Sequence, residues 1–199
     1  ESKVNKEVRM ASARNHTATH LLHEALKEVL GDHVNQAGSL VTPERLRFDV
    51  THFEPISKEE LKAVEEKVNK AILDALEVNC EIMNINDAKE KGAMALFGEK
   101  YGNEVRVVSM GDYSVELCGG THIDNIAKIG LFKIVSEGGI AAGVRRIEAK
   151  TGYGAYLVEK TEADILKDIE RKLKATNSNL IEKVEKTLET LKDTEKELE

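Results

Sequence analysis

Helix-breaking residues almost disappear after Gly152, and this change constrains the fold more than any other feature of the sequence. Residues 153–199 contain no Pro, a single Gly, 12 acidic and 9 basic residues, and their apolar residues recur at helical spacing. One apolar seam ends at Leu173, and a second begins at Ile181 after the polar segment 176–179. We therefore expect two C-terminal helices over residues 153–199, forming a helical hairpin or a coiled-coil segment. The alternative is that the second helix is a frayed surface element cut off from its partner.

Residues 1–152 mix helical and strand periods and form the predicted domain. Asn15 is a candidate N-cap for a helix that Gly31 ends. Ser57 and Glu60 have the spacing of a capping box for a second helix. Apolar runs predict strands at residues 34–41, 46–50, 80–85, 105–110, 114–117, 129–136 and 144–149. This order predicts an α+β domain, with long helices packed on a largely antiparallel sheet.

The composition argues against several functional classes. With 29 Lys and Arg against 36 Asp and Glu, the formal net charge is −7, which disfavours a broad nucleic-acid surface but allows a small basic patch for one RNA end. Trp is absent and only four Phe and four Tyr are present, so general single-strand stacking platforms are not expected. No apolar run approaches the roughly 20 residues of a membrane span. Two cysteines are poor evidence for a disulfide scaffold, and we expect a reducing, cytoplasmic setting.

Two pairs of metal-binding residue types lie about a hundred residues apart. His16 and His20 are four apart on the first predicted helix, so their imidazoles point the same way. Cys118 and His122 are also four apart, and the two glycines between them predict a turn that can wrap both side chains around one ion. Three nitrogens and one sulfur form a tetrahedral set that suits zinc. The remaining histidines are expected to be structural or exposed.

The residues alone leave the role of such a site open. Four protein ligands are typical of a closed structural zinc, whereas a catalytic zinc keeps one position free. Cys118 could instead be a free thiolate nucleophile with His122 as its partner. A metalloprotease is disfavoured, because Thr17 stands where the His-Glu-x-x-His motif has its Glu.

Six sequence blocks together resemble the editing domain of alanyl-tRNA synthetase and, more distantly, that of threonyl-tRNA synthetase. The blocks follow in order over residues 14–152. They are HTATHLLH at 16–23, VNQAGSLV at 34–41, LRFD at 46–49, GAMALFGEKY at 92–101, ELCGGTH at 116–122 and GVRRIEA at 143–149. The tail from residue 153 is similar in character to the helical region that follows editing in the alanyl enzyme.

The resemblance implies hydrolysis of alanine-specific tRNA, tRNA(Ala), that wrongly carries serine or glycine. It implies that His16, His20, Cys118 and His122 hold Zn²⁺, and that Thr19 and Gln36 line the amino-acid pocket; with Cys118 these two are the candidate catalytic residues. Without the resemblance, Thr19 would be read as a helix residue bonded to its own backbone, and Gln36 as a solvent-facing strand residue.

The implied partners are the mischarged 3′ end of tRNA(Ala), the remainder of a synthetase chain and a second copy joined through the helices. Arg9, Arg14, Arg145 and Arg146 are candidate RNA contacts, with surface solubility as the alternative. No synthetase core fits before His16, and the chain starts at Glu1 without an initiator Met, so we expect an excised or processed piece. Two other readings remain: a free-standing editing protein, and a non-catalytic zinc-stabilised tRNA-binding module.

Overall fold

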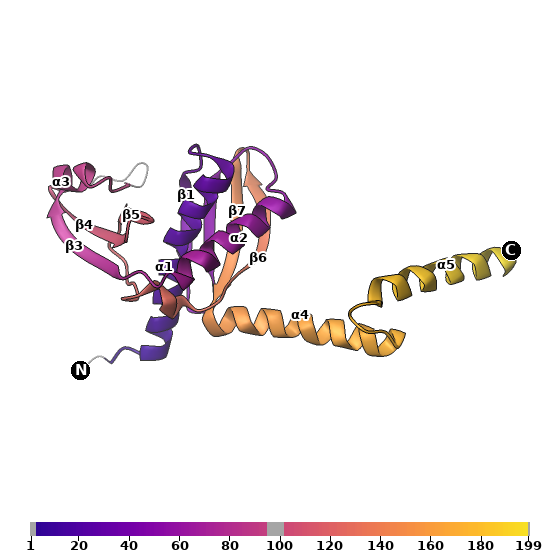
Figure 1. Cartoon of the computed structure of the whole chain (residues 1–199). Helices are drawn as coiled ribbons and strands as arrows, with labels where there is room; N and C mark the ends of the chain where they lie inside the picture. Colours follow the sequence, from indigo (N-terminus) through magenta and orange to yellow (C-terminus); the bar gives the residue numbers. More distant parts are fainter. Residues whose placement is uncertain (1–2, 95–101, 199) are drawn as a thin grey trace. The chain divides into compact units, whose positions relative to one another are not determined.

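The computed structural model describes residues 3–94 and 102–198, which form two compact units, Glu1–Tyr156 and Leu157–Glu199 (Figure 1). The boundary expected after residue 152 stays a prediction. In chain order the elements are α1 (Lys6–Leu30), β1 (Gln36–Val41), β2 (Leu46–Thr51), α2 (Lys58–Leu73), β3 (Val78–Asn84), α3 (Ile85–Glu90), β4 (Glu104–Met110), β5 (Ser114–Leu117), η1 (Ile126–Ile129), β6 (Phe132–Ala141), β7 (Val144–Thr151), α4 (Gly152–Leu173) and α5 (Leu180–Leu198).

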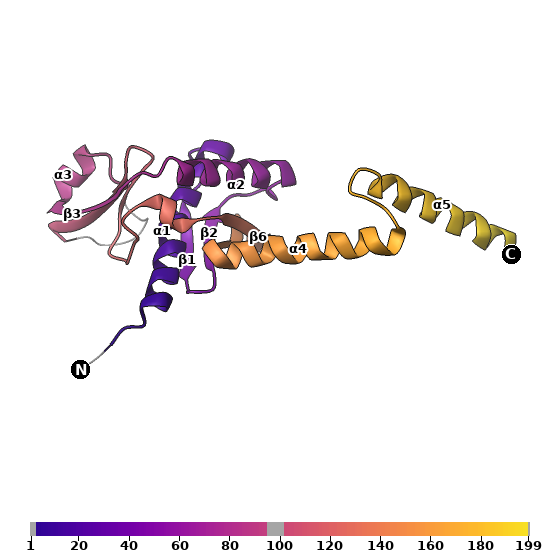
Figure 2. The same cartoon turned by 60° about the horizontal axis from the view of Figure 1, so that its bottom comes forward.

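A four-stranded antiparallel sheet in the order β1-β2-β7-β6 carries the main core, with α1 and α2 packed on it (Figure 2). The buried face of α1 supplies Leu21, Leu22 and Leu26, and these residues share one cluster with Phe48 of β2 and Ile147 of β7. The predicted α+β class with long helices on antiparallel strands is confirmed.

The strands divide between two sheets rather than one. A second antiparallel sheet has the order β3-β4-β5 and packs with α3 around a small cluster formed by Ala88, Val105, Val107 and Leu117. The other face of β4 contributes Val108 and Met110 to the main core. The two faces of β4 therefore contact two different hydrophobic clusters. The next strand, β5, ends at Leu117, directly before the turn that begins at Cys118.

The expected start of the first helix was wrong. Asn5 caps α1, and its side chain accepts hydrogen bonds from the backbone of Glu7 and Val8. Asn15 is instead buried in the middle of the helix, where its Nδ2 donates to Thr42 O at 2.8 Å. Its Oδ1 accepts a hydrogen bond from Thr151 at 2.7 Å. Tertiary partners therefore satisfy the amide that sequence reasoning assigned to a cap.

Several other element boundaries differ from those predicted, whereas the predicted start of the second helix is confirmed. The capping box of Ser57 and Glu60 is present at the start of α2. Ile85, expected to end a strand, begins α3 after the N-cap Asn84. Residues 126–129 form η1, so the strand expected at 129–136 begins later, at Phe132, and runs to Ala141. Short capped helices of four to six residues give too little periodicity to be recognised from sequence.

Both predicted C-terminal helices are present, separated by residues 174–179. Their apolar seams are exposed, with Ile169 at 39%, Leu188 at 60% and Leu198 at 83%. How these seams are covered stays a prediction. Across residues 3–94 and 102–198, no helix has both the length and the apolar character that crossing a membrane requires.

Candidate metal centre and adjoining pocket

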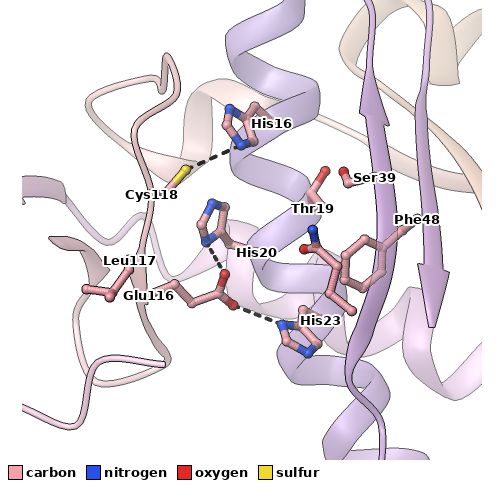
Figure 3. A pocket seen from close by; sticks show the side chains of 10 residues that line it. His16, Thr19, His20, His23, Ser39, Phe48, Glu116, Leu117 and Cys118 are labelled. Atoms are coloured by element: carbon pink, nitrogen blue, oxygen red, sulfur yellow. Dashed lines mark hydrogen bonds and ion pairs between the residues drawn. The ribbon is translucent and has the colours of Figure 1, made fainter. Parts of the chain in front are cut away.

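The two predicted ligand pairs meet in the fold. His16 and His20 lie one turn apart on α1, and the turn after β5 brings Cys118 beside them (Figure 3). His122, from the same turn, completes the group. One ligand atom from each of the four residues lies within 4.8 Å of the other three. Cys118 Sγ is 3.5 Å from His16 Nε2 and 3.3 Å from His122 Nε2.

These separations fit a tetrahedral metal ion. Zinc bonds of about 2.3 Å to sulfur and about 2.0–2.1 Å to nitrogen, at tetrahedral angles, place sulfur and nitrogen ligands about 3.5 Å apart. Cys118 lies at this separation from the two imidazole nitrogens nearest to it. The cluster is therefore compatible with a bound metal without a large rearrangement of its side chains.

Buried partners orient two of the imidazoles. His20 Nδ1 lies 2.8 Å from Glu116 Oε2, which leaves Nε2 on the side of the cluster. His122 Nδ1 lies 3.1 Å from Thr17 Oγ1. Because the single hydroxyl proton of Thr17 is donated to Ala13 O, the hydroxyl accepts a hydrogen from His122 Nδ1, and the lone pair of this histidine is on Nε2. Such outer partners fix the tautomer that metal binding needs.

Glu116 and His23 were not among the predicted site residues. The second oxygen of Glu116 lies 3.1 Å from His23 Nδ1, and both side chains are buried (Figure 3). The sequence did hold two signals. His23 follows His20 by three residues on the same helix face, and Glu116 lies in the predicted strand two residues before Cys118.

The electrostatics of the metal-free site favour a thiolate at Cys118 and a neutral imidazole at His122, but the protonated form of His20. Burial opposes ionisation of Cys118, but the contacts of its sulfur with the imidazoles of His122, His16 and His20 outweigh this effect and lower the pKa of the thiol to about 3. Burial lowers the pKa of His122 to about 4, which keeps this imidazole neutral. Burial also opposes the charged form of His20, yet the charge of Glu116 raises its pKa to about 9. Because metals bind thiolate and neutral imidazole, Cys118 and His122 are in the binding form, whereas His20 would release a proton when a metal binds.

The second glycine of the turn is required by the close approach of His16. A Cβ on Gly120 would lie 2.0 Å from His16 Cε1 and 2.4 Å from Nδ1. A Cβ on Gly119 would have no atom within 4 Å. The two neighbouring glycines therefore have different roles: the absence of a side chain at Gly120 leaves space for the ring of His16, whereas a Cβ at Gly119 would meet nothing within 4 Å.

A pocket of about 380 Å³ of empty space, including its open mouth, adjoins the cluster. It shares His16, His20 and Cys118 with the cluster, and Thr19 and Gln36 are also among its lining residues. Thr19 is 5% exposed, and its hydroxyl donates to Asn15 O at 2.9 Å. Thr19 therefore lines the pocket and also donates a hydrogen bond to the backbone of its own helix.

Ser39 is a further lining residue that sequence reasoning missed. In a regular strand Gln36 and Ser39, three residues apart, would face opposite sides of the sheet. A bulge between Gln36 and Gly38 shifts the register, so that Gln36 pairs with Val50 and Ser39 with Phe48. Both polar side chains therefore reach the pocket. Gly38, a glycine inside the strand, is the sequence signal that could have indicated the bulge.

Three of the four candidate RNA-contacting arginines have side-chain partners within the chain. Arg145 pairs with Glu137, and Arg146 makes two hydrogen bonds of 2.8 Å to Asp49. Arg14 donates to Lys128 O at 3.0 Å. Arg9 is exposed near the start of α1. The block at 92–101 is described only as far as Met94, and its residues 95–101 lie outside the described part of the chain.

Comparisons with known proteins place this site in a family context. The family model "Threonyl and Alanyl tRNA synthetase second additional domain" matches residues 105–148, which include the turn with Cys118 and His122. An alanine–tRNA ligase of Fusobacterium nucleatum subsp. nucleatum is 70% identical over 191 residues, covering 96% of this chain and 22% of the relative. One of Clostridioides difficile is 65% identical over 195 residues, covering 98% of this chain and 22% of the relative.

The chain thus spans about a fifth of the length of these curated relatives, at 22% of each. The high identity extends over nearly the whole chain, beyond the segment that the family model matches. These matches confirm that the chain belongs with the alanyl-tRNA synthetases, as a segment that carries the second additional domain shared by threonyl and alanyl tRNA synthetases.

Proposed function

We propose that this chain is the editing domain of an alanine–tRNA ligase and hydrolyses the ester that joins serine or glycine to tRNA(Ala). The observation that carries the proposal is the shared wall between the metal cluster and the pocket. His16, His20 and Cys118 belong to both, so an ester bound in the pocket would lie beside the ligand set. The proposed partners are the mischarged 3′ end of the tRNA and the remainder of a synthetase chain. The proposed location of the protein is the cytoplasm.

The polar lining suits recognition of a serine hydroxyl. The proton of Thr19 is used on Asn15 O, so its oxygen can accept a hydrogen bond from the substrate. Gln36 and Ser39 add an amide and a second hydroxyl. Alanine would leave such groups unpaired, at about 1–3 kcal/mol for each buried group. This difference would complement a synthetic site that rejects serine poorly, because serine adds only a hydroxyl to alanine. Glycine lacks the hydroxyl, and its inclusion depends on the family resemblance.

Zinc is the metal that the donor set fits, and His16, His20, Cys118 and His122 would hold it. When bound, it would supply positive charge beside the ester. The chain's own residues would orient the site: Glu116 holds His20, and Thr17 holds His122. Thr19, Gln36 and Ser39 would hold the amino acid, and the apolar Phe48 would restrict water at the pocket wall.

The direct test is incubation of the zinc-loaded chain with serine-charged tRNA(Ala). We expect serine release well above the rate in buffer. The Thr19→Val variant should lose about tenfold in kcat/KM, the equivalent of one hydrogen bond of about 1.4 kcal/mol. Thr190→Val is a matched control, because Thr190 makes the same type of backbone hydrogen bond, to Lys186 O at 2.9 Å, on the exposed helix α5. Serine release no faster than in buffer, with metal bound and the fold intact, would refute the activity.

A structural metal is the second candidate function, and the number of protein ligands favours it. Four ligands are typical of a closed site. The Cys118→Ala variant separates the two candidates. Loss of folding together with loss of metal would support a structural ion, whereas a folded chain without hydrolytic activity would support a role in the reaction.

A further inference from the structure

We propose that Arg106 is a positioning residue of the metal centre, and that its guanidinium holds the turn which presents Cys118 and His122. The proposal rests on the metal site proposed above. Arg106 lies in β4, outside the ligand set and the pocket lining. It acts through the backbone of the turn and touches none of the imidazoles that we assign as ligands.

One nitrogen of the guanidinium joins both arms of the turn. Arg106 Nη1 donates to Cys118 O at 2.9 Å and to Gly120 O at 2.7 Å. The second terminal nitrogen, Nη2, donates to Cys80 Sγ on β3 at 3.0 Å. The backbone contributes another link, because Cys118 N donates to Arg106 O at 3.0 Å. Arg106 thus ties the ligand turn to two strands of the second sheet.

The turn needs such support because of its own sequence. Gly119 and Gly120 have no side chains to pack, and glycine backbone loses more conformational freedom on ordering than any other residue. A stiffer residue at position 120 would displace His16, which occupies the space that a Cβ would take. The planar fork of an arginine can join two carbonyl groups in a fixed geometry, whereas a lysine ammonium offers a flexible point charge.

The charge of Arg106 also suits this place. The carbonyl oxygens of Cys118 and Gly120 direct the negative ends of two dipoles at one nitrogen of the guanidinium. In the described residues, the hydrogen bonds of Arg106 go to these carbonyls and to a thiol. Its guanidinium therefore acts on the ligand turn without first being neutralised by a hydrogen-bonded carboxylate.

The test measures metal binding rather than hydrolysis, so its outcome is separate from that of the deacylation assay. All proteins carry Cys80→Ser, so that only Cys118 can contribute a thiolate to the absorption of bound Co²⁺. Arg106→Gln and Arg106→Lys are compared with Arg45→Gln, a control at an exposed arginine that pairs with Glu148. The readouts are zinc affinity by chelator competition, the Co²⁺ absorption spectrum and thermal unfolding.

We expect Arg106→Gln to weaken zinc binding by about 10- to 100-fold, as is typical of outer partners of a metal site. Its Co²⁺ spectrum should lose intensity or shift, while the fold is retained through the backbone link from Cys118. Arg106→Lys should recover part of the affinity, and Arg45→Gln should match the parent. Unchanged affinity and spectrum in Arg106→Gln would overturn the proposal. Failure of the parent to bind metal would overturn it as well, and so would unfolding of both Arg106 variants, which would assign Arg106 to the fold.

Discussion

Replacement of Gly120 by alanine should disable the metal centre while leaving the fold in place. The new Cβ would lie 2.0 Å from His16 Cε1, and ordinary contact begins at 3.4 Å, so the ring must move by about 1.4 Å. Metal–ligand distances tolerate only about 0.2 Å. His16 is therefore lost as a ligand in this variant. Because the clash is with the end of a side chain that can rotate away, the core of the domain should be little affected.

The expected loss of zinc affinity is at least about 100-fold, which corresponds to about 2.8 kcal/mol. It is measured by competition with a chelator, together with the Co²⁺ spectrum and the unfolding curve of the metal-free protein. Gly119→Ala is the matched control, since its Cβ meets no atom within 4 Å. Two results would contradict a steric role for Gly120: zinc binding by Gly120→Ala as tight as in the parent, or a loss of zinc affinity in Gly119→Ala as large as in Gly120→Ala.

Three further predictions concern stability. Thr17→Val removes the buried hydroxyl that accepts from Ile123 N at 3.3 Å and lies 3.1 Å from His122, and it should cost about 1–3 kcal/mol in urea unfolding; no loss would contradict the hydrogen-bond assignment. The hydrogen bond from Arg146 holds the pKa of Asp49 below its ordinary value of 3.8. The pair therefore makes its full contribution to stability at pH values above 3.8. This contribution is lost as the pH falls through the lower pKa of Asp49 in the folded state. Asp49→Asn should therefore flatten the acid limb of the unfolding free energy, and an unchanged limb would exclude this pair as its cause. Free zinc at about 1,000 times its dissociation constant should raise the unfolding free energy by about 4 kcal/mol in the parent, and should raise it much less in Cys118→Ala.

Short sequence patterns predicted some helix and strand bounds correctly. The capping box of Ser57 and Glu60 marked the start of α2, and the strand at residues 114–117 was found with its observed bounds. Asn15 shows where this reasoning stops. Its residue type suits a helix cap, but its partners Thr42 and Thr151 come from distant parts of the chain, and only the folded structure brings them to it.

Sequence spacing predicted the two C-terminal helices and the four residues of the candidate metal cluster, because four-residue spacing on a helix and across a Gly-Gly turn limits where side chains can point. The surroundings of these four residues depend on long-range packing. Glu116 and Thr17 orient the imidazoles, the bulge in β1 turns Gln36 and Ser39 to one side, and the space beside Gly120 is filled by His16. These features depend on strand register and on packing between segments about a hundred residues apart, which no local pattern specifies.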